Sequence, residues 1–305
     1  MAGTKKTIAI LGAGAVGNFL AVKLWQCGNE VVLITSKEKA EIFNSRGILF
    51  KSEVFGNIEA SPRAVSELDF IPDVLFVTTK APGIKKVIKR VPTSKIGTNT
   101  VVIPLLNGME HIEDLRFRFG KRVAVGTISI EVFMESKNFV KHTTPFVKIE
   151  IASRINYINK EDLEEMAIFL TGCGIKTKVG KNEAQTIWNK LARLNALSLT
   201  TSVTDKPVGV LREDYYWRVK IEDCIKEAAR VAERDGAIIK LENEMQFIDN
   251  LDPRQLTSMQ RDISAGKESE LDAIAGSILR SAEKQGLDCP TIQELVEKIQ
   301  SKTFV

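Results

Sequence analysis

The first half of the chain alternates short apolar runs with amphipathic stretches. Four apolar runs are too short for helices and are typical of buried strands: residues 7–11, 31–34, 74–77 and 101–105. Helical spacing follows them over residues 15–27, 37–46, 83–90 and 110–119. Strands that alternate with helices in this way predict βαβ units, and hence an α/β domain with a largely parallel, doubly wound sheet.

Two other stretches of this region have β character. Residues 48–60 alternate as in a hairpin, and residues 122–153 are β-rich without helical spacing. We expect the latter to add strands that extend the sheet. A helix over residues 161–170 and a short strand over residues 176–179 should follow.

Beyond Lys181 the spacing of apolar residues is helical. It covers residues 183–200, 215–235, a stretch around Asn243, 269–285 and 292–302, with no convincing strand between them. The pattern predicts two domains, an α/β domain over residues 1–181 and an all-α domain over residues 182–305.

The composition is that of a globular protein, and it argues against several functions. The 43 basic and 39 acidic side chains leave a net charge of +4 without a dense basic stripe, so we expect no nucleic acid partner. We expect neither a signal peptide nor a membrane-spanning run, which predicts a cytoplasmic protein without a membrane partner. The four cysteines are widely spaced, and with His111 and His142 they indicate neither a disulfide framework nor a metal site.

A glycine-rich loop directly follows the first predicted strand. It has the G-x-G-x-x-G pattern, between a strand and a helix, in Gly12-Ala13-Gly14-Ala15-Val16-Gly17. In that context the first glycine makes a tight turn, the second lets a pyrophosphate approach the backbone, and the third lets helix and strand pack closely. The first amides of the helix would face the phosphates, so the loop predicts a Rossmann-type dinucleotide site.

The end of the second predicted strand indicates which dinucleotide binds. An NAD-specific site usually has Asp or Glu there, which accepts hydrogen bonds from the adenosine ribose. This sequence instead has Ser36 and Lys37, a hydroxyl and an ammonium that suit a 2′-phosphate. We therefore expect NADP(H) as the cofactor; the plainer alternative is that Lys37 only begins a solvated helix.

Three later segments carry polar residues that have ordinary explanations when each is taken alone. Asn107 could belong to a turn, Lys190 could be a surface lysine on a helix, and the charged run around Glu270 could be a solvated face. Asn107 does, however, follow a predicted parallel strand, and open α/β sheets bind ligands at the carboxyl ends of their strands.

Together these segments resemble the ketopantoate reductase family over most of the chain. The shared elements are the glycine loop, Lys80 closing a strand segment, N-G-M at Asn107, W-x-K-L at Lys190, S-M-x-x-D at Ser258 and an acidic element at Glu270. The resemblance implies a Rossmann domain, an all-helical C-terminal domain and an NADPH site in the cleft between them.

The resemblance also implies a role for each matching residue. Lys190 would be the catalytic general acid, assisted by Glu270, and Ser258 would bind the substrate carboxylate. Asn107 would contact cofactor and substrate. Glu268 competes with Glu270, but the spacing from Ser258 favours Glu270. The residues assigned to the cofactor are the glycine loop (residues 12–17), Ser36, Lys37, Lys80, Asn107 and Glu270.

The chemistry of keto-acid reduction requires such a set. Hydride delivery to a carbonyl carbon needs a proton donor beside the carbonyl oxygen. Desolvation would lower the pKa of the lysine, and a nearby carboxylate would oppose that shift and keep the lysine protonated. The cation would also stabilise negative charge that develops on oxygen.

The sequence departs from the family pattern where substrate contacts are expected. Asparagines usually stand four and eight residues after the lysine, on its helix face, but these positions hold Leu194 and Ser198. Asn195 lies about 140° around the helix from Lys190 and would reach the same ligand only through a local distortion. Val208 also stands where an asparagine is common. The substrate set is therefore Asn107, Lys190, Asn195, Ser198 and Ser258, and the reaction type is better supported than the substrate.

The resemblance to this family implies the reduction of 2-dehydropantoate (ketopantoate) to (R)-pantoate by NADPH, a step towards pantothenate and coenzyme A. One alternative is an NADPH-dependent reductase of another small 2-keto acid, motivated by Leu194, Ser198 and Val208. Another is a non-catalytic NADP(H)-sensing regulator, against which the presence of Lys190 and Glu270 argues. The expected partner is a small-molecule 2-keto acid, with a homodimer as an open alternative.

Overall fold

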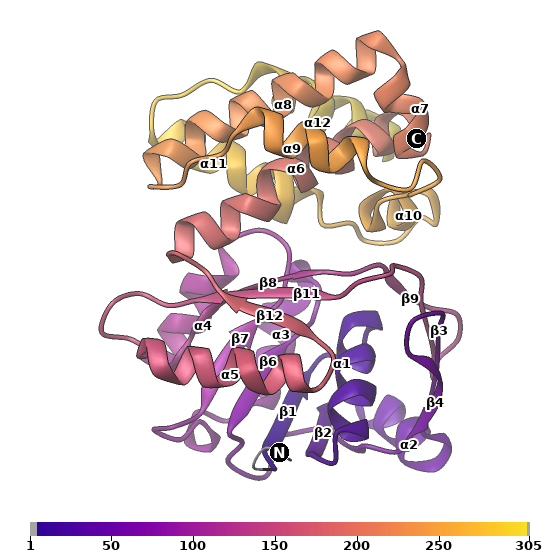
Figure 1. Cartoon of the computed structure of the whole chain (residues 1–305), viewed down its shortest axis with the longest axis vertical. Helices are drawn as coiled ribbons and strands as arrows, with labels where there is room; N and C mark the ends of the chain where they lie inside the picture. Colours follow the sequence, from indigo (N-terminus) through magenta and orange to yellow (C-terminus); the bar gives the residue numbers. More distant parts are fainter. Residues whose placement is uncertain (1–4, 304–305) are drawn as a thin grey trace. The chain divides into compact units, whose positions relative to one another are not determined.

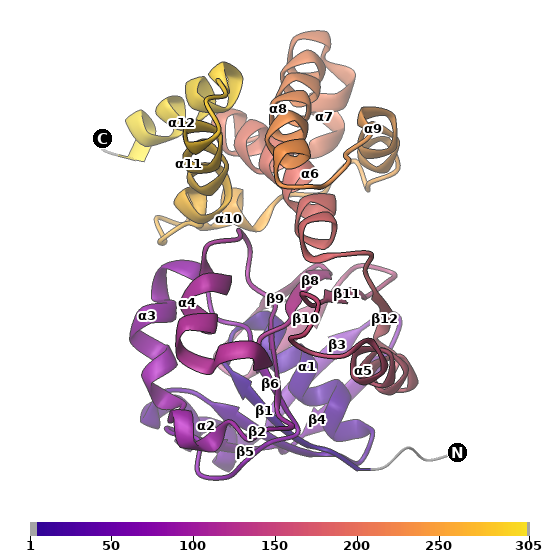
Figure 2. The same ribbon diagram turned by 90° about the vertical axis from the view of Figure 1, so that its left-hand side faces the viewer.

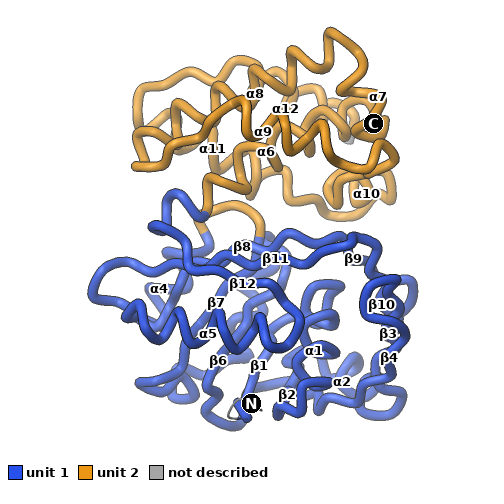
Figure 3. The backbone as a smooth tube through the Cα atoms, in the orientation of Figure 1, with its two compact units in different colours: residues 1–106, 111–186 blue, residues 107–110, 187–305 orange. Residues whose placement is uncertain are grey.

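The computed structural model describes residues 5–303 and divides into two compact units. Unit 1 comprises residues 1–106 and 111–186, and unit 2 comprises residues 107–110 and 187–305 (Figure 3). The domain boundary expected from the sequence, at residue 181, lies shortly before Ile187, where the chain passes from unit 1 to unit 2. The short segment 107–110 groups with the helical unit although it stands in the first half of the chain.

A five-stranded parallel sheet forms the centre of unit 1, in the order β5-β2-β1-β6-β7. Its register places Ile10 opposite Leu33 on one side and Phe76 on the other. This confirms the Rossmann-type sheet that the apolar runs predict. The strands are β1 (Thr7–Leu11), β2 (Glu30–Ile34), β5 (Arg63–Val65), β6 (Val74–Val77) and β7 (Val101–Pro104).

Helices cover both faces of this sheet because alternate strand residues point to opposite sides. Ile8 and Ile10 belong to one apolar core with α1 (Ala15–Gln26) and α5 (Lys160–Gly172). Ala9 and Leu11 belong to another. Figure 2 shows the two layers of helices on either side of the strands. The second core includes residues of α3 (Ile84–Val87) and α4 (His111–Phe119), and α2 (Lys37–Arg46) adds Ala40 and Phe43 to the first.

The remaining strands of unit 1 form two smaller sheets. The predicted hairpin over residues 48–60 is confirmed as β3 (Ile48–Ser52) and β4 (Gly56–Ala60), which β10 (Phe139–His142) and β9 (Val132–Met134) join in the order β4-β3-β10-β9. A three-stranded sheet has the order β12-β11-β8, from β8 (Val125–Ser129), β11 (Lys148–Ala152) and β12 (Lys176–Val179).

The expectation that residues 122–153 extend the main sheet is therefore wrong. Val123 makes a single bridge to Val102 of the edge strand β7, and β8, although it lies against β7, pairs with β11 instead. β7 ends at Pro104, which has no amide hydrogen to donate to a further strand. The predicted helix over residues 83–90 is also interrupted. Around α3, short 3₁₀ turns occupy Ala81–Gly83 and Ile88–Arg90, and others occupy Thr93–Lys95 and Gly120–Arg122.

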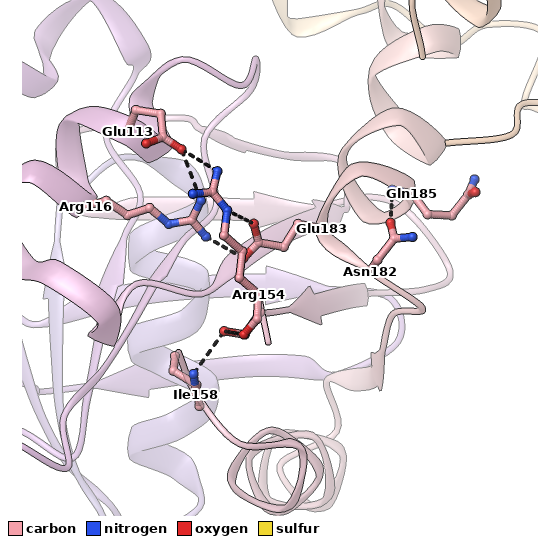
Figure 4. A network of polar contacts seen from close by, with 8 residues as sticks. Glu113, Arg116, Arg154, Ile158, Asn182, Glu183 and Gln185 are labelled. Carbon is pink, nitrogen blue, oxygen red and sulfur yellow. Dashed lines mark hydrogen bonds and ion pairs between the residues drawn. The ribbon is translucent and has the colours of Figure 1, made fainter. Parts of the chain in front are cut away.

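Paired charges fix the start of α6 (Glu183–Thr204) on unit 1 (Figure 4). The side chain of Asn182 caps the helix by accepting a backbone N–H of the first turn at 2.7 Å. Glu183 forms ion pairs with Arg116 and with Arg154, the latter at 3.2 Å. Both arginines also contact Glu113, at 3.2 and 2.8 Å. Carboxylate–guanidinium contacts of this kind are among the stronger hydrogen bonds in proteins, and here they order the entry into the helix.

Unit 2 is helical, as predicted. After α6 the helices are α7 (Val208–Glu213), α8 (Tyr215–Arg234), α9 (Leu241–Asp249), α10 (Ser258–Ser264), a π-helical turn (Asp272–Gly276), α11 (Ser277–Lys284) and α12 (Pro290–Thr303). Of these, α8 packs against α7, α9, α11 and α12 (Figure 1). Two of its helices, α7 and α10, were not predicted, because six or seven residues contain too few turns to show a clear period. No helix within residues 5–303 has the length and apolarity required to span a membrane.

Candidate active site

The glycine loop has the geometry of a phosphate-binding turn. Gly12 has φ +111°, and a Cβ there would lie 2.8 Å from a side-chain atom of Thr79. A Cβ on Gly17 would lie 1.9 Å from the carbonyl oxygen of Gly12, so helix and loop approach as closely as the pattern predicts. Around Gly14 a Cβ would meet nothing within 4 Å, which leaves the backbone open on that side.

The first turn of α1 suits an anion. Its N-cap is Gly14, which provides no side-chain cap, and no acidic residue lies in the first turn. Ala15 and Val16 are half-buried and Ala13 is buried, so small apolar groups surround the helix start. The N-terminus of a helix carries unsatisfied N–H groups and a partial positive charge. The loop and the helix start therefore fit the pyrophosphate of a dinucleotide.

Lys80 lies at the same edge of the sheet as the glycine loop. It follows Thr78 and Thr79 at the end of β6, and Thr78 donates its hydroxyl to the carbonyl of Gly12 at 2.8 Å. The side chain of Lys80 is exposed. The parallel pairing of β1 with β6 thus brings this predicted cofactor residue next to the loop.

At the end of β2 the two predicted residues differ in what their side chains do. The hydroxyl of Ser36 caps α2 by accepting the N–H of Lys39 at 3.3 Å, whereas Lys37 is exposed. Arg90 lies at the same point, where its guanidinium donates to the carbonyl of Thr35 and, at 3.1 Å, to that of Ser66. In the sequence Arg90 stands close to Lys85, Lys86 and Lys89. Its proximity to Thr35 could not be predicted, because 55 residues separate the two.

In unit 2, three predicted residues form a continuous chain of hydrogen bonds. The ammonium of Lys190, on α6, donates to Oδ1 of Asn107 at 2.7 Å. Nδ2 of Asn107 donates to Oε2 of Glu270 at 2.8 Å. The carboxamide of Asn107 is thereby oriented, with its oxygen towards the cation and its N–H group towards the carboxylate. The competing Glu268 is not the carboxylate that binds Asn107.

The charge state of Lys190 follows from its surroundings. Burial lowers the pKa of its ammonium to about 8, the carboxylate of Glu270 opposes this shift, and the guanidinium of Arg193 adds to it. These are the opposing effects expected from the sequence for a lysine general acid. An ammonium has three N–H donors, and Asn107 takes one of them. Lys190 can therefore donate a proton to a ligand oxygen near neutral pH.

Neighbouring contacts hold the helix that carries Lys190. The buried Trp188 donates its indole N–H to Asp235 at 3.0 Å, at the end of α8. Arg193 forms an ion pair with Glu244 at 2.9 Å, and its guanidinium lies 4.4 Å from the ring centre of Phe247. Both contacts link α6 to other helices of unit 2, so the position of Lys190 is set by packing rather than by a mobile loop.

Ser258 begins α10 and has an exposed side chain. The cap of this helix is Thr257, whose hydroxyl accepts the N–H of Gln260 at 3.2 Å. Ser258 is therefore not required as a cap. Its hydroxyl is open to a ligand.

Asn195 and Ser198 lie on α6 but are fully buried. Neither the carboxamide of Asn195 nor the hydroxyl of Ser198 has a hydrogen-bond partner among the described residues. Ideal helix geometry turns them by about 140° and 80° from Lys190, and α6 is a regular α-helix over this stretch. Leu194, about 40° from Lys190, is the half-buried residue that shares its face.

Matches to known protein families cover both units. The model for the ketopantoate reductase PanE/ApbA family matches residues 8–154, and the model for its C-terminal domain matches residues 182–303. An uncharacterized oxidoreductase of Bacillus subtilis (strain 168), YkpB, is 25% identical over 296 residues, or 95% of this chain and 97% of the relative. A 2-dehydropantoate 2-reductase of Pyrococcus abyssi (strain GE5 / Orsay) is 26% identical over 287 residues, 93% of each chain.

Solved structures share the fold over nearly the whole length. A D-mandelate dehydrogenase, solved with NADH and anilino(oxo)acetate, has a TM-score of 0.88 and 23% identity, covering 97% of this chain and 98% of the other. A PanE/ApbA family ketopantoate reductase from Ralstonia eutropha JMP134 has a TM-score of 0.85 and 22% identity, covering 98% of this chain and all of the other (100%). At these identities the likeness shows the fold.

Proposed function

Because the chain belongs to the ketopantoate reductase PanE/ApbA family, we propose that it reduces 2-dehydropantoate to (R)-pantoate with NADPH. The observation that carries this proposal is the hydrogen-bonded chain of Lys190, Asn107 and Glu270, with a lysine pKa of about 8. A structural lysine needs neither an oriented amide nor a desolvated ammonium. A proton donor to a carbonyl oxygen uses both.

The proton step follows from the positions of these groups. As the carbonyl carbon is reduced, negative charge develops on its oxygen, and the ammonium of Lys190 stabilises that charge and transfers a proton to it. The product is a 2-hydroxy acid and a neutral lysine amine. Solvent then returns a proton to the amine, and the carboxylate of Glu270 favours that return because it raises the pKa of Lys190.

The glycine loop fits the pyrophosphate of NADP(H), because a Cβ at Gly12 or Gly17 would fill the space that the turn requires. When bound, this cofactor supplies the hydride. We assign Lys37 and Arg90 to its 2′-phosphate, with Ser36 at the same strand end and Lys80 beside the loop. Arginine and lysine suit a dianionic phosphate, and the strand end lacks the acid that would repel it.

We assign the carboxylate of the substrate to Ser258. Its hydroxyl is exposed at the start of α10 and is not used to cap the helix. A hydroxyl donor binds a carboxylate oxygen, and the adjacent helix start favours negative charge.

A second candidate substrate is a 2-keto acid that lacks the hydroxyl group of 2-dehydropantoate. Leu194 lies one helical turn from Lys190 on the same face and is half-buried. Its apolar side chain cannot donate or accept a hydrogen bond to a hydroxyl. A branched alkyl or aryl group would gain more from this contact than a hydroxymethyl group.

Turnover of NADPH with a matched pair of keto acids tests the proposal. 2-Dehydropantoate and 3,3-dimethyl-2-oxobutanoate differ only in the hydroxyl group, and phenylglyoxylate adds an aryl side chain. A higher kcat/KM for 2-dehydropantoate supports the first assignment, and a higher value for either analogue supports the second. Tight NADPH binding without turnover of any of the three would refute both and favour a regulator.

A further inference from the structure

Segment 107–110 carries Asn107, and it is anchored within unit 2 (Figure 3). Along the chain this segment connects β7 to α4, both elements of unit 1. At its centre Gly108 has φ +83°, and a Cβ there would lie 2.2 Å from the carbonyl oxygen of Ala273 in the π-helical turn. The backbone therefore rests directly on that turn, and only glycine permits the approach.

The end of the segment is held by a charged contact. The carboxylate of Glu110 accepts two hydrogen bonds from Arg280 on α11, at 2.8 and 2.7 Å. Such two-point pairing fixes the orientation of the carboxylate as well as its distance. The pairing lowers the pKa of Glu110, so the contact is fully charged at neutral pH.

The orientation of Arg280 is itself set by its helix. Asp272 accepts from Arg280 at 2.7 Å across two turns, with Gly276 between them. A Cβ on Gly276 would lie 2.6 Å from the Asp272 carboxylate and 3.0 Å from the Arg280 guanidinium. The glycine thus leaves the gap through which the two side chains meet. The π-helical turn that contains Asp272 and Gly276 begins two residues after Glu270. The backbone carbonyl of Glu270 accepts the N–H of Ile274 in this turn at 2.9 Å.

We infer that Arg280 is a positioning residue for the reaction. Arg280 and Asp272, which we call the clasp, hold the carboxylate of Glu110. The clasp thereby fixes Asn107 between Lys190 and Glu270. This inference rests on the proposed function for its catalytic consequence. Asn107 contributes both the oxygen that accepts from the ammonium of Lys190 and the N–H group that donates to the carboxylate of Glu270. A shift of its backbone would break both hydrogen bonds at once.

The expected effect is on turnover rather than on stability. The side chains of Arg280 and Glu110 are 39% and 49% exposed, and ion pairs so exposed contribute little to folding. Misplacing a catalytic contact by about 1 Å can slow a reaction by about a hundredfold. The protein also has a matched control: Arg218 pairs with Asp249 through two contacts of 2.7 and 3.0 Å, at 34% and 43% exposure, in the same unit.

The experiment compares Arg280→Gln with Arg218→Gln in the full-length protein. Arg280→Gln should lower kcat by about tenfold or more, with an unchanged melting temperature, and Arg218→Gln should leave kcat unchanged. In an Asn107→Ala background, Arg280→Gln should change kcat by less than about twofold, because the residue acts through Asn107. Hydrogen exchange of the amides in residues 107–110 should be several-fold faster in Arg280→Gln only.

Each result decides the matter. Unchanged exchange in Arg280→Gln would overturn the clasp whatever the substrate is. Faster hydrogen exchange in Arg280→Gln with an unchanged kcat would overturn the positioning role. The same role would be overturned if Arg280→Gln lowered kcat as much in the Asn107→Ala background as in the wild-type protein. If the wild-type protein reduces none of the keto acids, the proposed function fails, and exchange alone then supports or overturns the clasp.

Discussion

Replacing Lys190 with alanine removes both the proton donor and the cation beside the substrate oxygen. General acid catalysis contributes about 10²–10⁴-fold to a rate, so kcat should fall by at least about a hundredfold. NADPH affinity should be unchanged, because the glycine loop belongs to unit 1 and Lys190 to unit 2. The matched control is Lys226→Ala, which removes an exposed lysine of α8 that pairs with Glu222 and Asp223 and should not alter kcat.

The pH dependence provides an independent test of the same assignment. Reduction needs the protonated amine, so turnover must fall as pH rises through the pKa of Lys190, which burial lowers to about 8. With that pKa, about nine tenths of the lysine is protonated at pH 7 and about one tenth at pH 9, a tenfold difference. The wild-type kcat/KM, which reports the ionisation of the protein before the keto acid binds, should follow this curve, and the small residual kcat/KM of Lys190→Ala should not.

Three measurements on each variant decide the result: NADPH oxidation followed by absorbance, NADPH affinity by fluorescence titration, and the melting temperature. Unfolding or loss of cofactor binding would show that the substitution acts on structure. A folded Lys190→Ala protein that binds NADPH and turns over normally would refute the proton-donor role.

Other substitutions test the rest of the site. Glu270→Gln removes the charge that raises the pKa of Lys190, so the midpoint of the pH profile of kcat/KM should move below the wild-type value. An unmoved midpoint would show that the carboxylate of Glu270 does not affect the pKa of Lys190. Ser258→Ala should raise KM several-fold at constant NADPH affinity, and unchanged kinetics would remove Ser258 from the substrate site. The wild-type protein should bind NADPH at least about tenfold more tightly than NADH, about 1.4 kcal/mol. Lys37→Asp should narrow that difference, as titration of both cofactors would show, and equal wild-type affinities would contradict the 2′-phosphate assignment.

The local pattern of residues is sufficient for most of the secondary structure and for the glycine loop. A short apolar run followed by G-x-G-x-x-G and helical spacing describes contacts between neighbours in the chain, such as the approach of Gly17 to Gly12. The short helices Val208–Glu213 and Ser258–Ser264 were not predicted, because six or seven residues are too few to show a helical period. Sheet membership is not local either, so the strands after Val123 could be predicted as strands but not assigned to their sheets.

The sequence also indicated, through its resemblance to the ketopantoate reductase family, which residues could perform the chemistry: Lys190, Asn107 and Glu270. Only the tertiary structure decided that one amide joins them, because 83 and 163 residues separate Asn107 from its two partners. Long-range pairing depends on how helices pack, and no spacing along the chain encodes it. The same holds for Arg280, 170 residues from the carboxylate that it binds. In the sequence Arg280 is an ordinary helical arginine. Its proposed role follows only from the tertiary structure, in which segment 107–110 lies beside it.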